Sequence, residues 1–199
     1  MLTVALPLYR MNQIAWVAFE GLIRQEKSPK WELIVCEEKH EYQCGKQLIK
    51  QYKDRLKKVN CIKTTYIELD EHVNLAKKWQ IIGQKAKAES IGFVMQSGDC
   101  YPHKYRLHQT YLYLTDGFEW YQETRGFFFD LLLKKLIQYR HDTLNVYDWK
   151  TALNMAFNIK YARSIPETEL LRGIDNFIFN HCQCEGLKKI VSVKPMAIG

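Results

Sequence analysis

The first hundred residues alternate short apolar runs with segments of helical periodicity, and no other feature restricts the possible folds as strongly. The runs 2–8, 31–36 and 91–95 are predominantly apolar, with Glu32 as their one charged residue, as strands buried on both faces are, and 61–69 alternates as a half-buried strand does. Between them, apolar residues recur three or four positions apart, which predicts amphipathic helices, one of them capped by Asn74. Helices between successive strands make crossover connections, so we predict an α/β fold with a mostly parallel central sheet flanked by helices.

The second half of the chain has a different pattern. A helix is expected around 103–114, followed by the aromatic and β-branched stretches 117–121, 126–130 and 131–139, which favour short strands. Apolar residues within 149–157 indicate one further helix. We therefore expect a smaller mixed or antiparallel part in the second half of a single domain.

The positive net charge bears on the choice of partner. Lys and Arg number 29 against 22 Asp and Glu, which gives a formal charge of +7. Such a charge favours anionic partners, namely nucleic acid, phosphorylated small molecules or acidic membrane surfaces, although solvated basic faces explain it as well. The basic residues are dispersed and form no stripe interleaved with aromatic side chains, so we expect no nucleic acid partner.

Other features of the sequence concern the cellular setting. No apolar run approaches the roughly 20 residues of a membrane-spanning helix, and no basic segment precedes the apolar start, so we expect neither a membrane span nor a signal peptide. The six cysteines include no CxxC pair, and Cys36 lies within an apolar run, which favours reduced thiols. We therefore expect a globular, cytoplasmic protein.

Ligands of a parallel sheet bind beyond the carboxyl ends of its strands, where this chain places three polar clusters. These are Tyr9-Arg10, Glu37-Glu38 and Ser97-Gly98-Asp99. A carboxylate directly after a buried strand, with a glycine that allows close approach, can hold a divalent cation that bridges a diphosphate. The segment QSGDCYP at 96–102 is also rich in turn-forming residues, so a plain turn is the alternative interpretation.

The order of these segments resembles that of a family 2 glycosyltransferase with the GT-A fold. The first strand of that family commonly ends in Pro-x-Tyr-Asn, and residues 7–10 of this chain are PLYR. Its second strand commonly ends in acidic residues, as WELIVCEE at 31–38 does. The family then has a helix that begins near an Asn, a strand and a metal-binding Asp-x-Asp, and residues 72–102 follow the same course.

Later segments extend the resemblance to about residues 2–182. ALNMAF at 152–157 and RGID at 172–175 resemble the family's Ala-Leu-Asn-x-Ala-Phe and Gly-Glu-Asp. A compact domain of this size is also similar to those encoded by large algal viruses. The chain departs from the family at Ser97, which replaces the first aspartate of the metal motif (Gln96 does so under a shifted alignment). It also departs at Ile174, which replaces an acidic residue.

The resemblance implies a metal-dependent hexosyltransferase. It would move a hexose from a nucleoside diphosphate sugar, with a UDP-sugar favoured, to a sugar hydroxyl of a glycan or glycoprotein, and Mn²⁺ or Mg²⁺ would serve as the cofactor. Within one domain over 1–199, residues 1–102 would bind the nucleotide sugar and residues 103–199 the acceptor. The implied donor-binding residues are Pro7, Tyr9, Arg10, Glu37, Asn74, Lys78, Gln96, Ser97, Gly98 and Asp99.

Two acidic positions and one histidine carry the implied chemistry. Asp99 would be the main metal ligand, and Asp175 matches the catalytic base of the inverting enzymes. A carboxylate within hydrogen-bond reach of the acceptor hydroxyl can take its proton, whereas a helix-start carboxylate that only favours the helix dipole is the alternative; Glu169 is the second choice for the base. His181 is a further candidate metal ligand, although its place on an apolar stripe favours a core histidine.

Trp120, Tyr121 and Arg125 are the candidate acceptor contacts, because aromatic faces stack on sugar rings and Arg bonds hydroxyl groups; a core role for the aromatic residues is the alternative. Two other functions fit the same sequence. The missing acidic residues suit a catalytically silent sugar- or nucleotide-binding domain. A nucleotidyltransferase shares the sheet and metal layout, but RMNQ at 10–13 is not the Gly-rich basic loop that this class uses.

Overall fold

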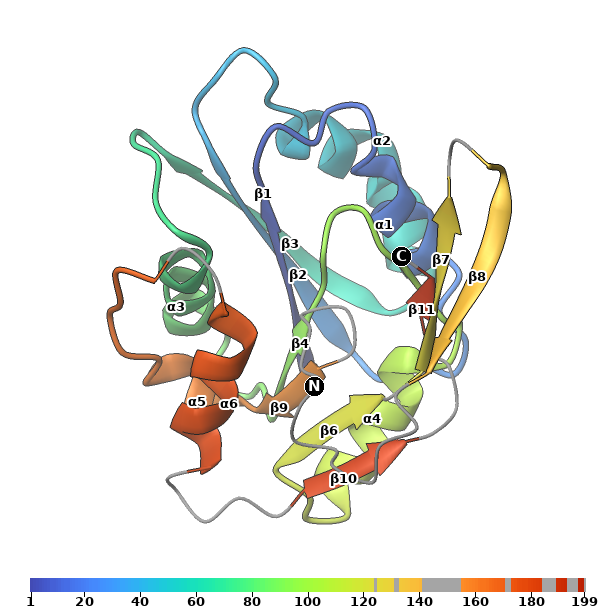
Figure 1. The fold of residues 1–199 in the computed structure, drawn as a ribbon, viewed down its shortest axis with the longest axis vertical. Coiled ribbons are helices and arrows are strands. Elements are labelled where there is room, and N and C mark those ends of the chain that lie inside the picture. Colours follow the sequence, from blue (N-terminus) through green and yellow to red (C-terminus); the bar gives the residue numbers. More distant parts are fainter. Residues whose placement is uncertain are drawn as a thin grey trace.

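A central seven-stranded sheet with helices on both faces, and a smaller sheet beside it, make up the computed structural model of this chain (Figure 1). The structure describes residues 1–123, 125–130, 133–140, 155–170, 173–183, 189–192 and 197–198. The strands of the central sheet are β1 (Leu2–Leu8), β2 (Trp31–Glu38), β3 (Cys61–Leu69), β4 (Gly92–Met95), β6 (Trp120–Glu123), β9 (Met155–Asn158) and β10 (Lys189–Ser192). The helices are α1 (Trp16–Leu22), α2 (Gly45–Lys58), α3 (Leu75–Lys85), α4 (Arg106–Thr115), α5 (Ile159–Arg163) and α6 (Ile174–Gln183).

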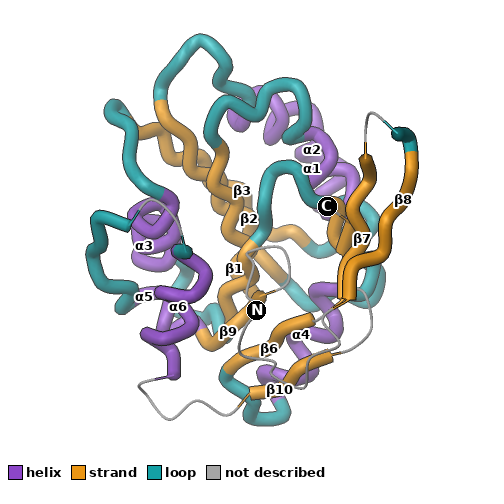
Figure 2. The backbone as a smooth tube through the Cα atoms, viewed as in Figure 1, coloured by secondary structure: helices purple, strands orange, loops and turns teal. Residues whose placement is uncertain are grey.

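The central sheet is mostly parallel, as predicted. Its strand order is β10-β6-β9-β4-β1-β2-β3. β1 pairs in parallel with both β2 and β4, while β9 runs antiparallel to β4 and β6. The loops that leave β1, β2, β3 and β4 all lie on the same side of the sheet, toward the upper part of the view in Figure 2. The polar residues at these strand ends are thereby gathered at one edge.

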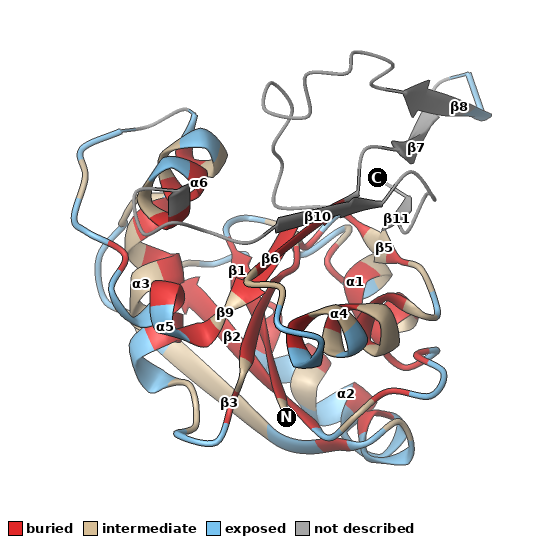
Figure 3. Ribbon diagram, turned by 90° about the horizontal axis from the view of Figure 1, so that it is seen from below, coloured by how far each residue is buried: buried red, intermediate tan, exposed pale blue. Residues whose placement is uncertain are grey.

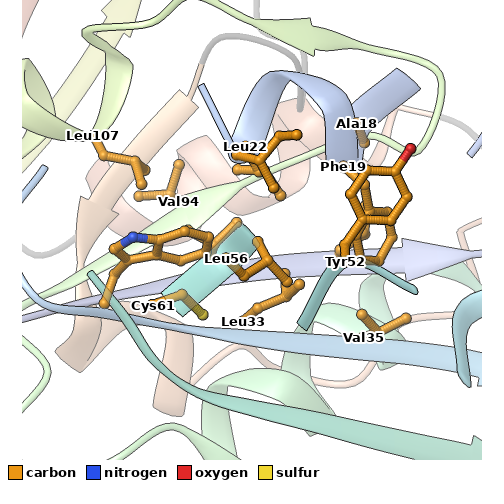
Figure 4. Packing of buried hydrophobic residues seen from close by; sticks show 14 of the residues in the cluster. Ala18, Phe19, Leu22, Leu33, Val35, Tyr52, Leu56, Cys61, Val94 and Leu107 are labelled. Carbon is orange, nitrogen blue, oxygen red and sulfur yellow. The ribbon is translucent and has the colours of Figure 1, made fainter. Parts of the chain in front are cut away.

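Each face of the sheet has its own hydrophobic core, which explains the predominantly apolar runs in the sequence. One face of the sheet packs against α1, α2 and α4, and Leu2, Val4 and Leu6 of β1 belong to this cluster. Figure 4 shows part of the same cluster. Ala5 faces the other side, in a cluster that contains residues of α3, α5 and α6. The inner strands are therefore buried on both faces, whereas the edge strand β3 is largely half-buried (Figure 3). In the described part of the chain, no helix combines the length and apolarity needed to cross a membrane.

The second sheet confirms the smaller mixed part predicted for the second half. Its order is β5-β11-β7-β8, with β5 (Tyr101–Pro102), β11 (Ala197–Ile198), β7 (Arg125–Asp130) and β8 (Lys135–Arg140). β7 and β8 are antiparallel, whereas β11 and β7 are parallel.

One predicted helix is wrong where the structure describes it. Ala156 and Phe157 belong to strand β9 rather than to a helix, while residues 149–154 lie outside the described part. Ala156 and Phe157 face opposite cores, which is the two-residue period of a strand. β9 fills the position between β4 and β6, and the hydrogen bonds to both neighbours override the helical spacing of the apolar residues.

Candidate active site

A pocket of about 300 Å³ opens at the carboxyl ends of β1 and β4, beside the first turn of α3. Its walls come from the first half of the chain. They are formed by Pro7, Leu8, Tyr9, Met11, His72, Val73, Asn74, Leu75, Lys78, Trp79 and Ser97. Five of the predicted donor-binding residues meet here, namely Pro7, Tyr9, Asn74, Lys78 and Ser97. The location is the edge where parallel sheets place ligands.

Lys78 is a buried cation in the wall of this pocket. Its Nζ atom donates to the carbonyl oxygen of Leu8 at 2.7 Å and to Oε2 of Glu38 at 2.6 Å. The same atom lies 5.3 Å from the ring centroid of Tyr9, which is 41% exposed. An ammonium group has three protons, and its bonds within the described residues use two of them, so the third can be donated to a ligand. The charge of Lys78 is thus held in place beside an accessible aromatic ring.

Glu37 binds the N-terminus of helix α2 and does not line the pocket. Its side chain is fully buried, and its carboxylate accepts from the backbone N–H groups of Cys44 at 3.1 Å and Gly45 at 2.8 Å. The hydroxyl of Tyr66 donates to the same carboxylate at 3.2 Å. Burial and the charge of Glu37 raise the pKa of Tyr66, so this hydroxyl stays a donor. Both carboxylate oxygens of Glu37 are therefore occupied within the protein, which leaves neither free for the predicted contact with a nucleoside.

Asn74 is the N-cap of α3, as predicted. Its Oδ1 atom accepts from the backbone N–H of Lys77 at 2.8 Å, and its Nδ2 atom donates to the carbonyl oxygen of Thr168 at 2.5 Å. Both ends of the amide are occupied, so Asn74 fixes the wall of the pocket and ties α3 to the segment 164–170.

The segment after β4 forms a turn that exposes the carboxylate of Asp99. Gln96 is fully buried, and its Nε2 atom donates to the carbonyl oxygens of Ser97 and Cys100, each at 2.8 Å. A Cβ atom on Gly98 would lie 2.6 Å from Sδ of Met11, so a larger residue here would displace the Met11 side chain. Asp99 is exposed, and its Oδ1 atom accepts from the hydroxyl of Ser97 at 2.5 Å. Gln96 and Gly98 shape the turn, while Asp99 faces solvent.

The described residues contain no group of three or more His, Cys, Asp or Glu side chains that would hold a metal ion by themselves. His181 contacts α5, because its Nε2 atom lies 3.1 Å from Oγ of Ser164 and its ring meets Tyr161 edge-on. No contact within the described residues joins His181 to Asp99. The donor set at Asp99, one carboxylate with a neighbouring hydroxyl, fits only an ion that takes its other ligands from a diphosphate and from water.

Asp175 lies in the first turn of α6, where a carboxylate favours the helix dipole. Gly173, with a φ of 70°, precedes the helix, and Arg172 lies outside the described residues. Ile174 packs in the same hydrophobic cluster as Trp79, which also lines the pocket. The start of α6 therefore packs against the core behind the pocket, and Asp175 itself is not part of the pocket wall.

The predicted acceptor contacts are core residues in two of three cases. Trp120 is 0% exposed and stacks on Phe157 with a centroid distance of 5.4 Å. Tyr121 is 1% exposed and stacks on Tyr113 at 5.0 Å. Neither ring has a face that a sugar can reach, which corrects this prediction. Arg125 begins β7, and its side chain lies outside the described part of the structure.

The sequence reasoning missed His72 at the pocket, and it gave no binding role to Glu38, one of the polar residues that it expected at this edge. His72 lines the pocket, with its ring centroid 4.7 Å from that of Tyr9. Glu38 lies behind it and binds both His72 and Lys78. Strand alternation was the available signal, because consecutive side chains of β2 point to opposite faces and only one of Glu37 and Glu38 can face α3. Arg10 lies beside the pocket, with its guanidinium carbon 5.3 Å from the centroid of the Tyr9 ring.

Comparisons with known proteins agree with this geometry at the level of the fold. No protein-family model matches the chain, and no curated protein matches its sequence. Among solved structures, S. aureus TarS 1–349 in complex with UDP-GlcNAc superposes with a TM-score of 0.77 at 11% identity, over 100% of this chain and 58% of that one. A longer TarS chain gives a TM-score of 0.76 at 11% identity, over 100% of this chain and 36% of that one.

A second glycosyltransferase shares the fold. The mannosyltransferase PcManGT from Pyrobaculum calidifontis, in complex with GDP-Man and Mn²⁺, gives a TM-score of 0.71 at 14% identity, over 100% of this chain and 56% of that one. The chain thus spans between about a third and three fifths of the length of these structures. At such identities the likeness concerns the fold alone, and it confirms the predicted GT-A-like glycosyltransferase fold.

Proposed function

We propose that this chain is a glycosyltransferase domain that transfers a hexose from a nucleoside diphosphate sugar to a hydroxyl of a glycan or glycoprotein. The observation that carries the proposal is the pocket at the ends of β1 and β4, where Tyr9 and Lys78 lie side by side. The aromatic ring suits a nucleobase, and the ammonium suits a phosphate. The fold agrees, because its solved relatives include complexes with UDP-GlcNAc and GDP-Man.

The same pocket supports the assignment of donor binding and acceptor binding to different parts of the chain. All of its lining residues fall between Pro7 and Ser97, which supports donor binding by residues 1–102. Residues 103–199 would then supply the acceptor side. In this proposal a UDP-sugar is the favoured donor.

Asp99 would hold Mn²⁺ or Mg²⁺ together with oxygens of the donor diphosphate. It is exposed next to Ser97, which lines the pocket, and the hydroxyl of Ser97 orients one of its oxygens. Such an ion, when bound, neutralises charge on the leaving diphosphate. Because one carboxylate is a sparse ligand set, the ion should bind together with the donor rather than ahead of it.

Asp175 would act as the base in a single inverting displacement. As the acceptor oxygen attacks the anomeric carbon, its proton passes to the carboxylate of Asp175. The new bond joins that oxygen to the anomeric carbon, and the bond from this carbon to the phosphate oxygen breaks. The nucleoside diphosphate leaves with the electron pair.

A catalytically silent binding domain is the second candidate. It is favoured by two observations, namely that Asp99 is the single carboxylate of its motif and that Asp175 is not part of the pocket wall. This candidate predicts donor binding without turnover.

One set of assays separates the candidates. UDP-Glc, UDP-GlcNAc and GDP-Man are tested with and without Mn²⁺, for binding by calorimetry and for release of the nucleoside diphosphate with sugar acceptors. The transferase proposal expects metal-dependent turnover that Asp99→Ala abolishes. Asp54→Ala is the matched control, because Asp54 is an exposed carboxylate on α2, with its side chain 90% exposed. Binding without turnover supports the silent domain, and equal metal-independent turnover by both variants and the wild type contradicts the role of Asp99.

A further inference from the structure

His72 presents one unoccupied ring nitrogen at the pocket that the proposed function assigns to the donor. It lies on the loop between β3 and α3, its side chain is 62% exposed, and its ring contacts that of Tyr9 at a centroid distance of 4.7 Å. Its Nδ1 atom lies 3.1 Å from Oε1 of Glu38. Within the described residues, its Nε2 atom has no hydrogen-bond partner.

Glu38 decides which nitrogen of His72 carries the proton. The carboxylate is bound on its other oxygen by the ammonium of Lys78 at 2.6 Å, and both side chains are 4% exposed. An ionised carboxylate accepts hydrogen bonds and donates none. The proton of the neutral imidazole therefore sits on Nδ1, and Nε2 is left as an acceptor.

The other side chains of the pocket wall do not offer a comparable acceptor. The oxygen of Asn74 is taken by a backbone N–H, and the hydroxyl of Ser97 donates to Asp99. Lys78 has donors only. The hydroxyl of Tyr9 can turn to donate or to accept, so it does not discriminate. Glu37, the acceptor that the sequence predicted for the nucleoside, is occupied by the start of α2.

We infer that His72 is the specificity-determining residue for the nucleobase, and that its Nε2 atom accepts a hydrogen bond from a ring N–H of the base. This inference rests on the proposed function. Uracil and guanine carry such an N–H on their pairing edge, whereas cytosine and adenine present a bare ring nitrogen there. When the bare ring nitrogen of cytosine or adenine faces Nε2 of His72, both nitrogens are acceptors and no hydrogen bond forms between them. The domain should therefore prefer UDP and GDP to CDP and ADP by about tenfold, the scale of one unmade hydrogen bond.

His40 also contacts Tyr9 and provides a matched control. Its ring lies 5.9 Å from that of Tyr9, and its nitrogens face the backbone N–H groups of Tyr42 at 2.9 Å and Arg10 at 3.4 Å. Both nitrogens of His40 are thus directed at the protein. Substitution of His40 removes a histidine beside Tyr9 without removing an acceptor that a base can use.

The test measures the affinities of UDP, GDP, CDP and ADP for the wild type, His72→Phe and His40→Phe by calorimetry. Phenylalanine keeps a ring against Tyr9 and removes both nitrogens. We expect His72→Phe to lose the tenfold preference by weakening UDP and GDP while CDP and ADP change little. We expect His40→Phe to keep the preference.

Nitrogen-15 spectra of the wild type provide an independent check, because they distinguish an imidazole protonated on Nδ1 from one protonated on Nε2. The expected result is the proton on Nδ1. Equal affinities for all four nucleotides, an unchanged preference in His72→Phe, or a proton on Nε2 would overturn the inference and leave the proposed function standing. Failure of all four nucleotides to bind the wild type would instead overturn the proposed function.

Discussion

The ammonium of Lys78 lies 2.6 Å from Oε2 of Glu38, and both side chains are 4% exposed. A further proton of Lys78 is donated to the carbonyl oxygen of Leu8, so one cation joins β1, β2 and α3 at the pocket. Two charges removed from water are stable only because they compensate each other. The pocket is therefore fixed by an ion pair whose partners depend on one another.

Loss of one partner of this pair should destabilise the protein strongly. Lys78→Met leaves the carboxylate of Glu38 buried without its cation, and we expect the free energy of unfolding to fall by about 3–5 kcal/mol. Replacing both Lys78 and Glu38 by Met should recover most of that loss while nucleotide binding stays impaired. Urea denaturation measures these changes.

The neighbouring residue provides the control for this prediction. Lys77 pairs with Glu167 at the surface, with side chains 38% and 75% exposed. Because water screens this pair, Lys77→Ala should lose far less stability than Lys78→Met. Equal losses in the two variants would contradict the role given to the buried pair.

Close packing of α3 against α5 predicts a second stability effect. A Cβ atom on Gly83 would lie 2.6 Å from the backbone carbonyl carbon of Ala162, which has no rotamer by which to move away. Gly83→Ala should therefore lower the free energy of unfolding by about 1–3 kcal/mol, even though alanine favours helices. Gln84→Ala, at an exposed position of the same helix, should change it by less than about 0.5 kcal/mol. Thermal denaturation that ranks the two variants in the opposite order would be incompatible with this packing.

Burial should make the core thiols unreactive in the native protein. Burial raises the pKa of Cys36, Cys44 and Cys61 to about 12. The reactive species is the thiolate, so at pH 8 these side chains remain protonated thiols and should alkylate slowly. Labelling with iodoacetamide, mapped by mass spectrometry, should rise sharply only after unfolding in urea. Rapid modification of Cys36 in the native protein would be inconsistent with its full burial in the core beside α3.

The base assigned by the proposed function can be tested separately from donor binding. Asp175→Asn should keep the affinity for the donor and lower the transfer rate by about 10²–10⁴-fold, the usual contribution of a general base. Glu169→Gln is the comparison, because Glu169 is exposed on the segment that Asn74 holds through Thr168. Loss of transfer in Glu169→Gln with full transfer in Asp175→Asn would move the base to Glu169.

The sequence predicted the elements whose pattern is set by burial. The strands at 2–8 and 91–95 were recognisable because side chains on both of their faces enter a core. Strand β9 was not recognisable, because its four residues are held by hydrogen bonds to β4 and β6. These strands are distant in the sequence, so the local pattern of residues carries no information about the pairing.

The candidate site was predictable in position but only partly in its residues. The rule that ligands bind beyond strand ends located Tyr9 and Ser97 at one pocket. It did not distinguish Glu37 from Glu38, because that choice depends on which side chain meets the start of α2 and which meets Lys78. Trp120 was misassigned because composition alone does not separate an aromatic residue of the core from one that binds sugar.

A crystal structure of the protein with UDP and Mn²⁺ would show whether the pocket at the ends of β1 and β4 binds the donor nucleotide. We expect the base against Tyr9 and His72, and the diphosphate directed toward Asp99 with the metal ion. UDP bound elsewhere, for example in the hollow lined by Lys46 and Lys50 beside α2, or a pocket that stays empty at millimolar UDP, would contradict it.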